Sequence, residues 1–462
     1  MRNYHIPASY NTLNADQKLA FDMLKYGYDS GKNYLITGNA GTGKSYLIDA
    51  YTEFCEMNNI TIVKTAPTGL AATTIGGVTL NKMFMLPPTI CEDRISGTQY
   101  SNIERKLIYA DVIVIDEISM VRIDAFNSVM RQIKKVNDYR ARRYGTSKNP
   151  VQIILCGDFG QLPPIIKDED KKLYTELYNK DIQDGFCYNS SYWTDFDITP
   201  ILLTDSMRQK DPAFCKALDN IKIGISKDID YINQNSAKQP IKDAIWLCGT
   251  NKTAKILNDG FIAQIPNPVF KTSTAKTEGR ANVKQTAFEE ILTFTVGARV
   301  LMVMKDTAAH HSRWQNGQLG TITAIHHDSV DIRFDGTYSP VNVEPAEVPF
   351  IEYTVDGDHL TPTEIGSVTQ YPFKIGYAIT IHKSQGQTYD KVNLVPEIFQ
   401  DGQLYVALSR CRELDNIFIA FDKNGNKLIP DQVRTAKDII KFALKVDAEY
   451  YEFKDFYLNT VR

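Results

Sequence analysis

A glycine-rich segment near the N-terminus has the residue types that bind phosphate. Residues 38–45 have the sequence GNAGTGKS and match the pattern G-x-x-x-x-G-K-[ST]. In such a loop the glycines let successive backbone N–H groups point inward around the phosphates. We expect Lys44 to reach the β- and γ-phosphates of ATP and Ser45 to bind Mg²⁺. The predicted nucleotide-binding residues of the loop are Gly38, Asn39, Ala40, Gly41, Thr42, Gly43, Lys44 and Ser45.

Two further stretches carry groups suited to hydrolysis. Residues 112–117, VIVIDE, are an apolar run that ends in adjacent carboxylates. We expect Asp116 to hold Mg²⁺ and Glu117 to orient or deprotonate the attacking water. In GDFGQLPP, residues 157–164, the amide of Gln161 is suited to sense the γ-phosphate from the end of a strand. Each stretch alone is also typical of a solvated strand end, whereas together with the phosphate loop they indicate ATP hydrolysis.

Strands and helices alternate around these groups. A helical pattern at 45–58 places Leu47, Ile48 and Tyr51 on one face. Alternating strands and helices predict a parallel α/β sheet over residues 1–200. The expected strands of this sheet are 34–37, 60–65, 112–115 and 151–156.

A second α/β series follows, with an interruption. Between residues 300 and 366 the pattern becomes short strands separated by Gly, Asp and Pro turns, which predicts a small inserted β barrel. We therefore expect a second parallel-sheet domain formed by 201–299 and 367–462, with the barrel inserted at 300–366. Its expected strands are 201–204, 245–248, 391–395 and 417–421.

The order of several motifs resembles that of superfamily 1 DNA helicases over most of the chain. IHKSQG and YVALSR, in this order, are the most specific of them after the phosphate loop. HKSQG and GD-x-x-QLPP are shared by the RecD, Dda and Pif branches, and residues 124–164 favour the Pif branch. The matching stretches are APTGLAA (66–72), GVTLNKMF (77–84), LTDSMRQ (203–209), AITIHKSQGQT (378–388) and LYVALSRCR (404–412).

The resemblance implies two RecA-like domains, an SH3-like barrel and a small wedge insertion at 86–106. It also implies an ATP-dependent DNA helicase that moves 5′ to 3′ on single-stranded DNA and unwinds tailed or forked duplex DNA. Gln17 would contact the adenine and Gly386 the nucleotide. Arg208 and Arg410, in the second domain, would contact the γ-phosphate, so that hydrolysis lets the domains separate. The candidate DNA-contacting residues are Thr68, Gly69, Thr79, Asn81, Phe84, His382 and Lys383.

Some features leave alternatives open. Asn81 stands where relatives often carry His, and YGTSKNP (144–150) replaces a glycine-rich turn. An ATP-gated clamp or remodeller of single-stranded nucleic acid, without unwinding, is therefore the alternative function. Residues 131–148 contain seven basic residues against one acidic residue and form either a solvated helix or a phosphate-binding surface. The tyrosine-rich stretch 450–457 is expected to pack as a terminal helix.

Composition sets the remaining expectations. The 462 residues have a formal net charge of −3, so that a nucleic-acid binder of this composition must concentrate its cations in one groove. The seven cysteines form no CxxC pair, and the histidine pairs 310–311 and 326–327 have no nearby cysteine, which favours free thiols and solvated histidines over a metal site. The N-terminus has no signal pattern and no apolar run suits a membrane span. We expect a cytoplasmic monomer that uses ATP and Mg²⁺.

Overall fold

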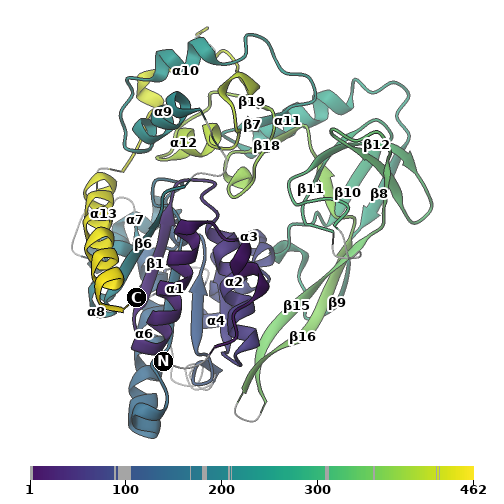
Figure 1. Ribbon diagram of the computed structural model, residues 1–462. Coiled ribbons are helices and arrows are strands. Elements are labelled where there is room, and N and C mark those ends of the chain that lie inside the picture. The colour runs from purple at the N-terminus through teal and green to yellow at the C-terminus, as the bar shows by residue number, and fades with distance from the viewer. Residues whose placement is uncertain are drawn as a thin grey trace. The chain divides into compact units, whose positions relative to one another are not determined.

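The computed structural model describes residues 4–87, 90–91, 106–166, 168–178, 185–205, 209, 211–306, 312–356, 359–422, 424–425, 427–436 and 438–461. The chain divides into two compact units (Figure 1). The first unit comprises Met1–Met207, Ile351–Thr363 and Ala436–Arg462, and the second comprises Arg208–Phe350 and Glu364–Thr435. Among the described residues, no helix is both long and apolar enough to cross a membrane.

The first unit is built on a parallel sheet whose strands lie in the order β3-β2-β4-β5-β1-β6. The four strands expected from the sequence are all present. β6 was expected in the second domain and is instead an edge strand here, because Ile201 pairs with Ile36 of β1. The strands are β1 (Asn33–Gly38), β2 (Ile62–Ala66), β3 (Val78–Thr79), β4 (Val112–Ile115), β5 (Gln152–Cys156) and β6 (Ile198–Leu203).

Helices cover both faces of this sheet, so that alternate side chains of each strand enter different cores. In β4, Ile113 and Ile115 belong to one apolar cluster, while Val112 and Val114 belong to the other. The helices of the unit are α1 (Ala15–Ser30), α2 (Lys44–Met57), α3 (Gly69–Thr74), α4 (Leu80–Phe84), α6 (Ile123–Tyr144), α7 (Asp168–Tyr178), α8 (Ser191–Asp195) and α13 (Ile439–Phe456).

The C-terminal helix α13 belongs to the first unit, not to the second domain as the sequence predicted. Residues 436–462 were assigned to the second domain, whereas α13 lies against β6 and Tyr450, Phe453 and Tyr457 are buried in the core of the first unit. The expectation of a packed terminal helix at 450–457 is met. The end of the chain packs on a hydrophobic surface of the first unit, and its position in the sequence does not predict this contact.

The second unit contains a smaller parallel sheet in the order β18-β7-β19-β20. Three of its four strands agree with the expected runs, and β18 takes the place of residues 201–204. The strands are β7 (Ile245–Cys248), β18 (Ala378–Thr380), β19 (Val392–Leu394) and β20 (Ile417–Ile419), and the helices are α9 (Pro212–Lys222), α10 (Ile229–Asn235), α11 (Asn251–Ile262) and α12 (Gln403–Leu408).

An antiparallel part interrupts this sheet, as expected. Five strands lie in the order β14-β13-β12-β11-β17. A two-stranded sheet pairs β10 with β8, and a three-stranded sheet has the order β15-β16-β9. The antiparallel part begins near residue 270 rather than 300, and residues 350–356 belong to β15, outside the five-stranded sheet. Its strands are β8 (Phe270–Thr274), β9 (Lys276–Gly279), β10 (Ile291–Thr295), β11 (Arg299–Met302), β12 (Leu319–Ile325), β13 (Val330–Phe334), β14 (Val341–Val343), β15 (Ala346–Asp356), β16 (His359–Gln370) and β17 (Phe373–Ile375).

Two finer expectations stay predictions. The wedge at 86–106 lies largely outside the described residues, which include only 86–87, 90–91 and 106 of it. The SH3-like character of the inserted strands rests on the resemblance alone.

Candidate nucleotide and nucleic-acid sites

The phosphate loop joins the end of β1 to the start of α2. Gly38 has φ 147°, and a Cβ there would lie 2.3 Å from the carbonyl oxygen of Leu203. Gly43 has φ 80°, and a Cβ there would lie 2.2 Å from Nε2 of Gln17. Neither position accepts a side chain without moving a neighbour, which is why the segment has glycine at both ends of its turn.

Lys44 and Ser45 begin α2, directly after the loop. The Nζ atom of Lys44 donates hydrogen bonds to the carbonyl oxygens of Gly38 at 2.8 Å and Asn39 at 3.0 Å. The ammonium group is therefore held over the loop. Ser45 is exposed in the first turn of α2, where the positive end of the helix dipole favours anions.

Gln17 contacts the phosphate loop from the start of α1. Its side chain completes a capping box with Asn14, in which Oε1 accepts from the backbone N–H of Asn14 at 3.1 Å. Its Nε2 donates to the carbonyl oxygens of Thr42 at 3.3 Å and Gly43 at 3.4 Å. The amide expected to contact adenine thus also fixes the loop to the N-terminus of α1.

Asp116 and Glu117 follow β4 directly. Oδ1 of Asp116 accepts a hydrogen bond of 2.9 Å from the backbone N–H of Glu117. Burial raises the pKa of Asp116, while hydrogen bonds from Glu117 and Cys156 and the charge of Lys44 act in the opposite direction. Glu117 has φ 48° and ψ 45°, a left-handed conformation that non-glycine residues rarely adopt and that is common at functional sites.

Gln161 is held by an acidic neighbour that the sequence analysis did not single out. Asp158 is buried, and its Oδ1 accepts from the backbone N–H of Gly160 at 3.0 Å while its Oδ2 accepts from Nε2 of Gln161 at 3.4 Å. The turn after β5 therefore fixes the orientation of the amide. The sequence signal was an aspartate two residues after an apolar strand. A carboxylate buried at such a place requires nearby hydrogen-bond donors.

Three neighbouring strands bring these groups to one edge of the sheet. β4, β5 and β1 are adjacent and parallel, so that the phosphate loop, Asp116 with Glu117, and Gln161 all follow carboxyl ends. Ligands of open α/β sheets bind at this edge. Such an arrangement is suited to binding a nucleoside triphosphate.

Arg410 of the second unit is buried rather than exposed, with 1% of its surface accessible. Its guanidinium donates to the carbonyl oxygens of Val406 at 2.8 Å, Gln387 at 3.1 Å and Ser384 at 3.3 Å, and to Oγ of Ser409 at 2.8 Å. These bonds join the end of α12 to the segment after β18.

Two other nucleotide-binding predictions concern the second unit. Gly386 is exposed in that segment with φ 78°. Arg208, the other arginine expected at the γ-phosphate, lies outside the described residues.

The predicted DNA-contacting residues of the first unit have different surroundings. Thr68 caps α3 and Thr79 caps α4, each through its hydroxyl oxygen, with Gly69 next to the first cap. Asn81 is exposed, and its Nδ2 donates to the carbonyl oxygen of Pro87 at 3.3 Å. The prediction that Phe84 contacts DNA is wrong, because Phe84 is fully buried in the hydrophobic core and no base can stack on it.

In the second unit, His382 and Lys383 form part of the short 3-10 helix η6 (His382–Ser384). His382 is half-buried, and burial lowers its pKa while a hydrogen bond with Gln400 acts in the opposite direction. Lys383 is exposed.

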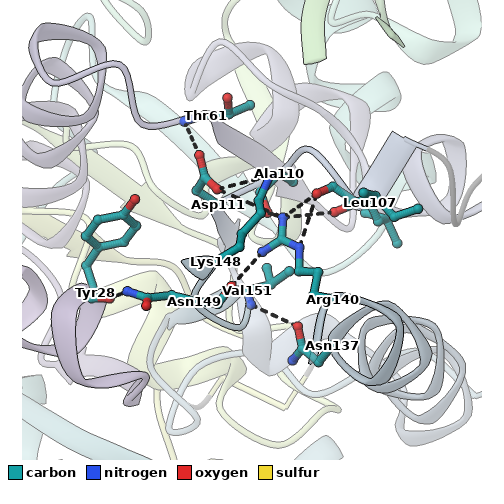
Figure 2. Close-up of polar contacts among 11 residues, drawn as sticks. Tyr28, Thr61, Leu107, Ala110, Asp111, Asn137, Arg140, Lys148, Asn149 and Val151 are labelled. Atoms are coloured by element: carbon teal, nitrogen blue, oxygen red, sulfur yellow. Dashed lines mark hydrogen bonds and ion pairs between the residues drawn. The ribbon is translucent and has the colours of Figure 1, made fainter. Parts of the chain in front are cut away.

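The basic segment 131–148 separates into inward and outward side chains. Figure 2 shows Arg140 of α6 pointing toward the backbone carbonyl oxygens of Leu107 and Ala110. Its guanidinium donates to Ala110 at 2.5 Å, to Ile108 at 2.7 Å and to Asn149 at 3.1 Å. Arg140 is 1% exposed and therefore a structural residue, which corrects the phosphate-binding interpretation at this position.

The same close-up shows how Asp111 completes this cluster (Figure 2). Its Oδ2 accepts from the backbone N–H of Thr61 at 3.0 Å, and its Oδ1 lies 3.9 Å from both Arg140 and Lys148. Lys134, Lys135, Arg142 and Arg143 remain exposed on α6. Exposure of these four cations fits both a solvated helix surface and a phosphate-binding surface.

The remaining titratable clusters offer no metal site within the described residues. His326 contacts Asp331 at 2.9 Å and His327 contacts Asp328 at 2.7 Å, on the exposed turn between β12 and β13. His310 and His311 lie outside the described residues. All seven cysteines are free, and six of them are buried.

Comparison with known proteins agrees with the motifs and the fold. A family model described as PIF1-like helicase matches residues 12–229. The ATP-dependent DNA helicase Pif1 of Campylobacter jejuni is 27% identical over 441 residues, covering 88% of this chain and 92% of the relative. Human PIF1 is 28% identical over 405 residues, covering 84% of this chain and 58% of the relative.

Solved structures give the same result. Unliganded Pif1 from Bacteroides sp is similar with a TM-score of 0.78 and 27% identity, over 95% of this chain and 97% of that one. The same relative in complex with ADP-AlF4 gives a TM-score of 0.80, with the same identity and coverage. These likenesses extend over both units, from the phosphate loop to the motifs after β18, and the family model, the curated relatives and the solved structures all show that the chain is similar to PIF1-like helicases.

Proposed function

We propose that this protein is an ATP-dependent DNA helicase that moves 5′ to 3′ along single-stranded DNA and unwinds tailed or forked duplexes. The observation that carries the proposal is the edge of the first sheet, where Lys44, Glu117 and Gln161 follow three adjacent parallel strands. Relatives similar over nearly the whole chain are ATP-dependent DNA helicases, and Bacteroides Pif1 has been solved bound to single-stranded DNA.

The residues present fit a Mg²⁺–ATP complex. Mg²⁺ prefers oxygen ligands and retains several waters, and Ser45 and Asp116 supply a hydroxyl and a carboxylate at the phosphate loop. Burial raises the pKa of Asp116, and a cation bound nearby would favour its charged form. When bound, the cation would neutralise charge on the phosphate oxygens.

The other groups have separate roles. Lys44 would bind the β- and γ-phosphates, and Glu117 would take the proton of the attacking water. Gln161, oriented by Asp158, would donate to the γ-phosphate and lose this bond after hydrolysis. Arg208 and Arg410 are proposed to stabilise the charge of the transition state, a contribution of about 10³–10⁵ in rate for such arginines.

DNA would be bound chiefly through its phosphates. Thr68, Gly69, Thr79 and Asn81 are proposed contacts in the first unit, and His382 with Lys383 in the second. Because ionic contacts with phosphates release counterions, the affinity should fall steeply with salt.

The test is the ATPase rate with and without single-stranded DNA, followed by displacement on duplexes with a 5′ or a 3′ tail. We expect DNA to stimulate hydrolysis and only the 5′-tailed duplex to be unwound. No stimulation would remove the motor assignment, and unwinding of the 3′-tailed duplex alone would reverse the polarity. Stimulated hydrolysis without displacement on either substrate would favour the ATP-gated clamp.

Two variants control for the nucleotide site. Lys44→Ala should abolish hydrolysis, because the phosphates lose their principal charge. Glu117→Gln should bind ATP and retain DNA affinity yet turn over slowly. Normal hydrolysis by Lys44→Ala would show that the phosphate loop is assigned to the wrong residues.

A further inference from the structure

A half-exposed phenylalanine lies beyond the end of β19 in the second unit. Phe399 belongs to the segment 395–402, which connects β19 to α12, and 47% of its surface is accessible. The segment stands between the motifs at 378–388 and 404–412, and neither of them contains it. The residue pattern alone therefore gives Phe399 no role.

The sheet places Phe399 beside groups already proposed to contact DNA. β7 is the middle strand of three that run parallel, between β18 and β19. The backbone N–H of Val395, after β19, donates to the carbonyl oxygen of Leu247 at 2.9 Å. The backbone N–H of Ile381, after β18, donates to the carbonyl oxygen of Cys248 at 2.9 Å. Phe399 and η6 thus follow strands that end at one edge of the sheet, where open α/β sheets bind ligands.

The ring of Phe399 lies against the backbone that follows β7. A Cβ at Gly249 would lie 2.9 Å from Cε1 of Phe399, so that glycine permits the close approach of the ring. Gly249 is buried, whereas nearly half of the phenylalanine stays accessible. The ring is therefore supported by the edge of the sheet and still open to a ligand.

Hydrogen bonds from neighbouring elements hold the backbone on which the ring stands. Gln403, the first residue of α12, is fully buried. Its Oε1 accepts from the backbone N–H groups of Phe399 at 2.8 Å and Gln400 at 3.1 Å. Nη1 of Arg434 donates to the carbonyl oxygen of Phe399 at 3.0 Å. Because both backbone groups of Phe399 are engaged, its position needs little ordering before a ligand binds.

An aromatic ring at such an edge is suited to stacking on a base. Phe84, the aromatic residue that the sequence suggested for DNA contact, is buried, whereas Phe399 is accessible. Exposed cations follow two strands of the same edge, Lys252 after β7 and Lys383 after β18. Proteins that bind single strands combine cations for the backbone with aromatic rings for the bases.

We propose that the ring of Phe399 stacks on one base of single-stranded DNA at the carboxyl edge of the second parallel sheet. The inference rests on the proposed DNA-binding function and adds a base contact to contacts that are chiefly with phosphates. Every base has a π face, so that this stacking tolerates any sequence.

The experiment measures binding of a fluorescent oligothymidine to the full chain at several salt concentrations. Phe399→Ala should weaken binding about tenfold, the effect of losing one base stack. The slope of log affinity against log salt should stay unchanged, because no phosphate contact is lost, whereas Lys383→Gln should reduce that slope by about 0.7. Phe270→Ala, which removes a ring that is 51% exposed from β8, is the matched control and should change little.

A strand without bases separates stacking from any other role of the ring. Wild type and Phe399→Ala should bind an abasic oligomer of the same length equally, since it offers nothing to stack on. Phe399→Trp keeps an aromatic surface and should bind oligothymidine like the wild type. Its added fluorescence, above that of the three native tryptophans, should be quenched by oligothymidine and not by the abasic strand.

Several outcomes would overturn the inference. Equal affinity of wild type and Phe399→Ala for oligothymidine, an equal loss on the abasic strand, or the same loss in Phe270→Ala would each do so. The unfolding midpoint of Phe399→Ala in urea should lie close to that of the wild type, because the ring is half-exposed. If that variant does not fold, absence of quenching in Phe399→Trp overturns the inference. A wild-type chain that binds no oligothymidine would remove the proposed function as well, which distinguishes the two failures.

Discussion

At the residue scale, Arg410 shows that one side chain can hold two motifs together. Four of its hydrogen bonds end on Val406 of α12, on Ser409 directly after it, and on the segment that contains Ser384 and Gln387. The motif around HKSQG and the motif around LSR are therefore mechanically joined within the second unit.

Arg410→Ala should consequently reduce stability as well as turnover. The substitution leaves buried carbonyl oxygens without donors, and we expect a loss of about 3 kcal/mol in the free energy of unfolding. Turnover should fall about 10³-fold if the arginine also acts on the γ-phosphate. Urea unfolding and steady-state ATPase measure the two effects, with exposed Arg412→Ala as the stability control. Unchanged stability would contradict the burial of Arg410, and unchanged turnover would remove it from the reaction.

At the element scale, α6 follows β4 in the chain and contains most of the basic segment 131–148. The helix buries Phe126, Met130 and Ile133 against the sheet and directs Arg140 inward near its C-terminal end. Arginine suits this position because its five donors match several carbonyl oxygens at once, and lysine would satisfy fewer. The exposed surface of α6 carries Lys134, Lys135, Arg142 and Arg143.

Arg140→Met and Arg142→Met form a matched pair on this helix. Arg140→Met should reduce the free energy of unfolding by about 3 kcal/mol, because the carbonyl oxygens of Ile108, Ala110 and Asn149 lose their donor. Arg142 is exposed, and its replacement should change stability by less than about 0.5 kcal/mol. Equal effects in chemical denaturation would show that Arg140 is not the structural residue seen in Figure 2.

At the scale of the whole molecule, the first unit is completed by distant parts of the chain. α13 supplies Tyr450 and Phe453 to a core otherwise built from the first 203 residues. Phe453 lies 5.8 Å from the ring of Tyr34 of β1, measured between ring centroids. The nucleotide-binding sheet therefore depends on the last residues of the chain for part of its packing.

Phe453→Ala should destabilise the first unit by about 3 kcal/mol, because a buried aromatic ring leaves a cavity. Phe456, on the same helix, is 45% exposed, and Phe456→Ala should cost less than about 1 kcal/mol. Thermal unfolding with and without ATP would report the difference, since nucleotide stabilises the unit that binds it. A Phe456→Ala effect as large as that of Phe453→Ala would contradict the packing of α13.

The parts of the site that were predictable share one property. The phosphate loop, Asp116 with Glu117, and Gln161 are short runs in which a few consecutive residues perform the chemistry, and each follows an apolar strand. Parallel strands with helical connections then bring their carboxyl ends to one edge. Residue types and local spacing were therefore enough to predict the sheet, and the nucleotide site proposed at its edge rests on the same short runs.

Other features depend on contacts between residues far apart in the chain. Sequence alone suggested that Phe84 and Arg140 faced solvent or DNA, whereas both are buried, because burial is set by the elements that pack over a residue. The membership of β6 and α13 in the first unit is of the same kind. Residue types alone indicate which groups could bind phosphate, whereas packing between distant segments sets which charged side chains, such as Arg140 and Arg410, are buried.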